Sequence, residues 1–119
     1  MEYPKVDLRP QVQNPARYYN EEGQVGIVIS PCFGSGWSSY ESDPKKAEFM
    51  LTNPALVKAV LEFADDSEIK KIFEEAGIQA PMLDYLEVKF LKPGTKFYID
   101  EYDGYESIQT IDEINWAVA

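Results

Sequence analysis

The feature that most constrains the fold is a set of three short segments near the C-terminus in which apolar and polar residues alternate. The segments read LEVKF, KFYIDEY and ESIQT, and they are joined by KPGT and DG. Pro93-Gly94 suits the centre of a tight turn, and Asp103-Gly104 suits a two-residue hairpin turn that needs positive φ at both positions. The last third of the chain is therefore predicted to form an antiparallel β-meander.

The two turns also predict which residues lie opposite each other. They place Phe90 opposite Phe97, Val88 opposite Ile99, and Ile99 opposite Ile108. Because successive side chains of a strand point to opposite faces, these five apolar residues are expected on one face, the core face. The other face is expected to carry Lys89, Tyr98, Asp100, Tyr102, Tyr105, Ser107 and Gln109.

The middle of the chain predicts one buried strand and short helices. Residues 25–30 are almost continuously apolar, which indicates a central strand covered on both faces. A capping residue followed by proline starts a helix at 43–44 and again at 53–54, and Gly77 suits a helix end. We therefore expect two or three short helices between residues 43 and 77.

These elements predict an α+β fold, with a small antiparallel sheet packed against the helices. The sheet would combine the C-terminal meander with the N-terminal central strand. Residues 1–23 contain three prolines and are expected to form an extended arm without regular structure. Residues 24–119 are expected to form a single domain, ending in an edge strand at 115–119.

The chain is strongly acidic, with 21 acidic and 11 basic side chains among 119 residues and a net charge of −10. Such a charge repels nucleic acid and anionic membranes at long range and favours basic protein surfaces. It is also an ordinary means of keeping a small protein soluble. We expect no direct nucleic-acid partner and no membrane partner.

The sequence contains no histidine and a single cysteine, Cys32. Histidine-based catalysis is therefore excluded, and zinc binding is disfavoured. No internal disulfide can form, which fits a cytoplasmic protein. Cys32 lacks a histidine partner that would activate it. We expect no metal, no cofactor and no enzymatic activity.

The stretch PCFGSGWSSY follows the central strand and mixes glycine, serine and aromatic residues. It resembles neither a Walker loop nor a full G-x-G-x-x-G motif, although aromatic faces can stack nucleobases and serine hydroxyls can donate to phosphate. One interpretation is a ligand-binding loop, and the other is a tight turn with Trp37 in the core. The candidate ligand-binding residues are Phe33, Gly34, Ser35, Gly36, Trp37, Ser38 and Tyr40.

The second hairpin concentrates acidic and tyrosine side chains. Its register places Glu101 directly opposite Glu106, and no basic residue occurs between Ile99 and Asn115. Tyrosine offers contact area at low entropic cost, so this hairpin is a candidate protein-binding surface or docking point for Arg and Lys. The alternative is an ordinary solvent-exposed face. The candidate partner-binding residues are Asp100, Glu101, Tyr102, Asp103, Tyr105 and Glu106.

Three segments together, VGIVISPCFGSGW, LKPGTKFYIDEYDGYESI and the terminal NWAVA, resemble a group of small uncharacterised proteins from tailed bacteriophages and prophages. That group pairs an ISPG-aromatic-G-x-GW segment with a GTKF-x-I-x-EYDG-x-E segment. The resemblance covers residues 24–119, and Cys32 stands where the group has glycine.

The resemblance implies a phage protein acting in the cytoplasm of a bacterial host. Our first expectation is a counter-defence protein that sequesters a nucleotide-derived signalling molecule. The alternative is an acidic, DNA-mimic-like inhibitor of a host defence or CRISPR protein, and a third is a phage accessory protein with no defence role. A homo-oligomer is possible, because exposed sheet edges can pair between protomers, and it would suit the first expectation.

Overall fold

The computed structural model describes residues 14–32, 36–83 and 85–110, and within these ranges the protein has the expected α+β fold. The predicted edge strand at 115–119 and most of the N-terminal arm lie outside the described residues. The elements are, in chain order, β1 (Val25–Ile29), the 3₁₀ helix η1 (Ser38–Tyr40), α1 (Pro44–Thr52), α2 (Pro54–Leu61), α3 (Asp66–Glu75), β2 (Glu87–Leu91), β3 (Phe97–Tyr102) and β4 (Tyr105–Thr110).

The described strands form two separate two-stranded antiparallel sheets, β1–β2 and β3–β4. The expectation of one meander was wrong at the first hairpin. Phe90 lies opposite Gly26 of β1, and Phe97 lies opposite Thr110 of β4. The tight turn at Pro93-Gly94 does form, with the Thr95 amide donating to the Lys92 carbonyl. The chain then passes into another layer instead of returning along β2.

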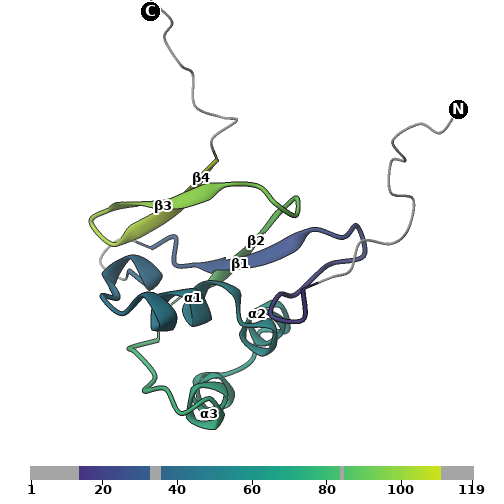
Figure 1. Cartoon of the computed structure of the whole chain (residues 1–119). Helices are drawn as coiled ribbons and strands as arrows, with labels where there is room; N and C mark the ends of the chain where they lie inside the picture. Colours follow the sequence, from purple (N-terminus) through teal and green to yellow (C-terminus); the bar gives the residue numbers. More distant parts are fainter. Residues whose placement is uncertain (1–13, 33–35, 84, 111–119) are drawn as a thin grey trace, which may run out of the picture.

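Figure 1 shows three layers, with the β3–β4 hairpin on one side of the β1–β2 sheet and the helices on the other. This arrangement explains why β1 is apolar along its whole length. Ile27 and Ile29 are each 2% exposed and Val28 is fully buried. The prediction of a strand covered on both faces is thereby confirmed.

Helices α1 and α2 begin where the sequence predicts, and α3 begins with a cap of the same kind. The side chains of Asp43, Asn53 and Asp65 accept hydrogen bonds from the backbone amides of the first turns of α1, α2 and α3. Such caps satisfy amides that have no partner inside the helix. Beyond α3, Gly77 adopts a φ of +71°, the left-handed conformation that ends many helices.

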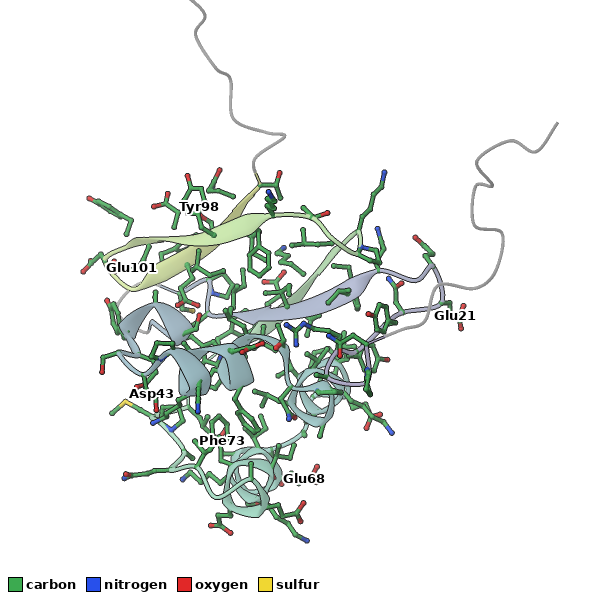
Figure 2. The ribbon with its side chains drawn as sticks, viewed as in Figure 1. Glu21, Asp43, Glu68, Phe73, Tyr98 and Glu101 are labelled. Atoms are coloured by element: carbon green, nitrogen blue, oxygen red, sulfur yellow. The ribbon has the colours of Figure 1, made fainter. Side chains whose placement is uncertain are left out.

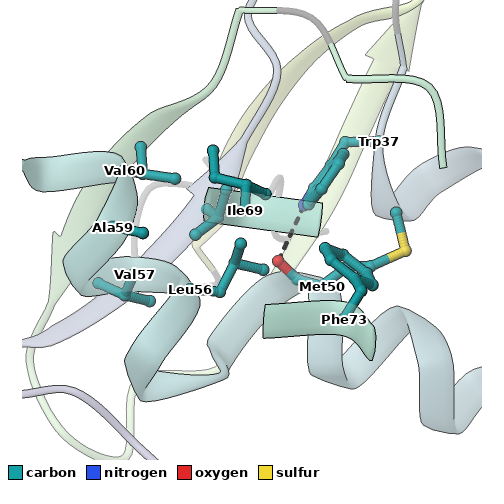
Figure 3. Packing of buried hydrophobic residues seen from close by; sticks show 9 residues of the cluster. Trp37, Met50, Leu56, Val57, Ala59, Val60, Ile69 and Phe73 are labelled. Atoms are coloured by element: carbon teal, nitrogen blue, oxygen red, sulfur yellow. Dashed lines mark hydrogen bonds between the residues drawn. The ribbon is translucent and has the colours of Figure 1, made fainter. Parts of the chain in front are cut away.

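The main hydrophobic core lies between the sheet and the helices (Figure 3). Trp37 meets Phe73 edge-on, with ring centroids 6.1 Å apart, and its indole N–H donates to the Met50 carbonyl oxygen at 2.8 Å. Val28 joins this cluster from β1, and Leu56 joins it from α2. The core therefore fixes the end of the loop that follows β1 against the helices.

The segment before β1 packs on the body of the protein. The Gly26 amide donates to the Tyr18 carbonyl, Tyr19 forms a β-bridge with Val25, and the Tyr18 side chain packs against the core. In the described ranges, every helix is too short or too polar to span a bilayer.

Candidate functional site

The two sequence features that looked functional, the glycine-containing loop and the acidic hairpin, are bonded to each other. The Gly36 amide donates to the Gly104 carbonyl at 2.9 Å, and the Glu106 amide donates to the Ser30 carbonyl at 3.0 Å. Pro31 and Tyr105 also form a β-bridge. The loop after β1 therefore lies against the start of β4 and the turn before it.

Glu106 is the centre of this junction. Its side chain is 1% exposed. The carboxylate accepts hydrogen bonds from the backbone amides of Ser30, Trp37 and Ser39, each at 3.0 Å, and from the Ser39 hydroxyl. A carboxylate can accept several hydrogen bonds at once, so these donors replace the water that burial removes.

This geometry resembles an anion-binding loop, because backbone amides converge on a negatively charged group. The anion, however, is part of the protein. Since the amides of Trp37 and Ser39 already donate to Glu106, these two donors are not free to hold the phosphate of an external ligand. The Ser39 hydroxyl and the two loop amides thus serve an internal contact.

Glu101, the residue opposite Glu106, also has a structural role. One oxygen of its carboxylate accepts from the Tyr40 hydroxyl at 3.1 Å and from the Gly104 amide at 2.6 Å. Partial desolvation of the phenol, together with its hydrogen bond to the negatively charged Glu101, raises the pKa of Tyr40 above its ordinary value. The shift favours the protonated phenol, the form that donates to Glu101.

Separate hydrogen-bond partners explain how two glutamates can lie opposite each other on one face of the hairpin. Like charges in that position destabilise a strand pair. Here Glu106 points inward to the amides of the loop, while Glu101 is exposed and bonded to Tyr40. The expectation that Glu106 belongs to a partner-docking surface was wrong, because its side chain is buried and its oxygens are already engaged.

The predicted ligand-binding residues separate into three groups. Phe33, Gly34 and Ser35 lie outside the described residues. Trp37 is 3% exposed, so its ring cannot stack on a ligand while it remains in the core, and that expectation was wrong. Ser38 is also buried, which excludes it as a surface donor.

Gly36 and Tyr40 remain at the surface side of the loop. Gly36 adopts a φ of +69°, and a Cβ atom built on it would lie 2.2 Å from the Tyr40 ring. Only glycine fits there without moving that ring. Tyr40 is 58% exposed, so the Gly36-Tyr40 contact positions an aromatic side chain at the surface beside Glu101.

Two buried hydroxyls of this region, those of Ser30 and Ser38, have no hydrogen-bond partner among the described residues. Ser30 comes before and Ser38 comes after the undescribed positions 33–35. They are the polar atoms of the loop that the Glu106 contacts leave unused.

The hairpin outer face is the side of β3–β4 made by Tyr98, Asp100, Tyr102 and Tyr105, with Asp103 beside it in the turn. The register confirms that these strand residues share one face, together with Ser107 and Gln109. Lys89, predicted to join them, lies in β2 and so belongs to the other sheet. Figure 2 places Tyr98 on the hairpin, the layer farthest from the helices.

This face is well exposed. Tyr98, Tyr102 and Tyr105 are 51%, 76% and 39% exposed, and Asp100 and Asp103 are exposed as well. The turn at Asp103-Gly104 has positive φ at both residues, 51° and 84°, as its sequence predicts. The hairpin therefore presents aromatic and acidic side chains on a defined backbone.

Within the described ranges, no group of three acidic, cysteine or histidine side chains is arranged to hold a metal ion. Comparison of the chain with models of protein families, with curated proteins and with solved structures finds no match.

Proposed function

We propose that this protein is a non-enzymatic binding module whose hairpin outer face docks on a basic protein surface. The observation that carries the proposal is the exposure of three tyrosines around Asp100 and Asp103 on a hairpin without any lysine or arginine. Exposed aromatic side chains held on regular structure are typical of interface anchors.

The chemistry of this face favours a cationic partner. Carboxylates on a β-strand can accept from arginine or lysine, and tyrosine rings can contact a guanidinium group through their faces. The net charge of −10 would speed the approach of a basic surface and repel competing acidic ones.

In the phage setting implied by the resemblance, such a partner would be a host defence protein in the bacterial cytoplasm. Proteins that bind nucleic acid carry basic surfaces, and an acidic face of this kind would compete for them. The proposed function is then inhibition by occupation of that surface, as in the DNA-mimic-like interpretation of the sequence.

Sequestration of a nucleotide-derived molecule by the loop has less support. Its main aromatic platform, Trp37, is in the core, and two loop amides donate to Glu106. What favours it is the pair of buried hydroxyls on Ser30 and Ser38, which have no hydrogen-bond partner in the part of the chain that the structure describes. Native mass spectrometry of the protein purified from bacteria would detect a retained small molecule, and such a mass would favour sequestration over docking.

The docking proposal is tested with two variants of the hairpin outer face, Asp100→Lys and Tyr102→Ser, in affinity capture from a host with active defences. We expect each variant to weaken capture of the specific partner at least about tenfold, the effect of losing an interface anchor. The matched control is Glu74→Lys, which makes the same charge change at an exposed position of α3. Equal capture by Asp100→Lys, Tyr102→Ser and wild-type protein would refute the proposal.

A further inference from the structure

Strand β2 is an edge strand. It pairs with β1 along one side, and no second strand pairs with it in the described part of the chain. A groove of about 430 Å³ separates it from β4, with Glu87, Lys89 and Leu91 on one side and Ser107 and Thr110 on the other. The groove lies between the hairpin and the face of β2 that carries Glu87, Lys89 and Leu91, and the second edge of β2 has no paired strand among the described residues.

The hydrogen bonds that β1 makes away from β2 identify which backbone groups of β2 point toward its free edge. The amides of Gly26 and Ser30 bond to Tyr18 and Glu106, so they point away from β2. Because strand residues alternate, the hydrogen-bonded pairs with β2 are those of Val25, Ile27 and Ile29.

It follows that Val88 and Phe90 direct their amides and carbonyls outward along the free edge. Both side chains are only half-buried, whereas Val28, opposite Val88, is fully buried. An additional strand would satisfy the two backbone positions and cover both side chains.

We propose that the free edge of β2 binds the β2 edge of a second copy of this chain, antiparallel, about a two-fold axis through Val88. In this register Val88 lies opposite its own copy, and Leu86 lies opposite Phe90 of the second copy. Val88 and Phe90 offer outward-pointing backbone groups for these pairs, as an antiparallel ladder requires.

Charge complementarity selects this register. A two-fold through Val88 places Glu87 opposite Lys89 of the second copy, and it does so twice. Within one chain these two side chains already form an ion pair at 2.8 Å, so the interface would hold four charges of alternating sign. A two-fold through Lys89 or through Glu87 would instead place like charges opposite each other, which destabilises strand pairs.

The resulting dimer would have one continuous four-stranded sheet in the order β1–β2–β2–β1. The interface uses residues of β2, which belongs to a different sheet from the hairpin outer face, although Tyr105 of that face lines the same groove as Lys89. The dimer would therefore present two hairpin outer faces.

Sedimentation analysis tests the proposal. We expect the protein to sediment with twice the 13.6 kDa mass of one chain. Glu87→Lys alone and Lys89→Glu alone should each weaken the dimer about tenfold or more, because each creates two like-charge pairs. The double variant Glu87→Lys with Lys89→Glu restores both pairs with exchanged signs and should restore the dimer.

Val88→Pro is a second test, because it removes an outward-pointing amide and proline is tolerated at a strand edge, although it also shortens a side chain that packs against the core. We expect a folded monomer by circular dichroism and sedimentation. The exposed residue Lys58, on α2, supplies the control Lys58→Glu, which should leave the dimer intact. A monomeric wild-type protein, or a dimer that persists in Val88→Pro and in both single charge reversals, would overturn the proposal.

Discussion

Glu106 shows how a single side chain can join two parts of a small protein. It is buried in an acidic protein and accepts three backbone amides and one hydroxyl. Glu106→Gln keeps the size of the side chain but replaces one acceptor oxygen with an amide that faces the same donors. We expect a loss of about 3 kcal/mol in the free energy of unfolding, the cost of leaving buried donors unsatisfied. Urea unfolding measures it.

The control for this prediction is Glu101→Gln on the facing strand. Glu101 is exposed, and water can replace its contacts with Tyr40 and Gly104. We expect it to cost less than about 1 kcal/mol. If both variants lose a similar amount of unfolding free energy, the buried hydrogen bonds of Glu106 add no more stability than the exposed ones of Glu101.

Trp37 is the residue at which a ligand-binding and a core role lead to opposite results. Its ring packs against Phe73 and its N–H bonds to Met50. We expect Trp37→Ala to lower the free energy of unfolding by roughly 4 kcal/mol, as for other buried aromatic truncations. Trp37→Phe, which loses the hydrogen bond but keeps most of the packing, should cost less than half of that. A Trp37→Ala protein of unchanged stability would contradict the core role.

The roles of these residues were only partly predictable from the sequence. Periodicity placed Ile108 on the core face, and Glu106 lies two residues earlier on the same face, so its inward direction was available from the register. Its donors were not, because Ser30 and Trp37 lie 76 and 69 residues away along the chain. Sequence alone cannot assign contacts of that separation to one acceptor.

At the level of elements, local signals were reliable and pairing partners were not. The Asp103-Gly104 turn sets both the hairpin and its register, with Glu101 opposite Glu106 as predicted. The Pro93-Gly94 turn is equally well formed, yet β2 and β3 lie in different sheets. A turn sequence fixes the local backbone. The strand that pairs with β2 is instead set by contacts far apart in the sequence, here those with the buried strand β1.

The N-terminus of α3 gives a prediction about acid. The side chain of Asp65 accepts hydrogen bonds from the Ser67 hydroxyl and the Glu68 amide, and these bonds lower the pKa of Asp65 below its ordinary value of 3.8. A carboxyl group whose pKa is lowered on folding stabilises the protein above its unfolded pKa, and this contribution is lost as pH falls through the folded value.

The variant Asp65→Asn isolates this effect, because asparagine caps a helix about as well as aspartate but does not titrate in this range. We expect wild type and variant to have similar melting temperatures at pH 7. Below pH 3.8 the wild type should lose part of its stability that the variant retains. If the difference between the two melting temperatures stays constant from pH 7 to pH 3, the stabilising effect of the cap does not depend on the charge of Asp65.

At the scale of the whole molecule, the three layers are not joined equally. β1 is buried between the other two layers, and its core residues contact the helices directly. The inward side chains of the hairpin, Phe97, Ile99 and Ile108, are only half-buried. The hairpin therefore depends strongly on its polar junction with the loop, and it is the layer most readily released by local unfolding.

Native-state hydrogen exchange can detect this release. The amides of Trp37 and Ser39 donate to Glu106 on β4, so they should lose protection when the hairpin opens, although Trp37 also belongs to the helical core. We expect the Trp37 and Ser39 amides to exchange their hydrogens at about the same rate as the β3–β4 amides. This rate should be at least about tenfold higher than that of the Val57 amide of α2, which bonds to Asn53 within the helical layer. If Trp37, Ser39 and Val57 exchange at the same opening free energy, the three layers unfold as one unit, and the junction is no weaker than the core.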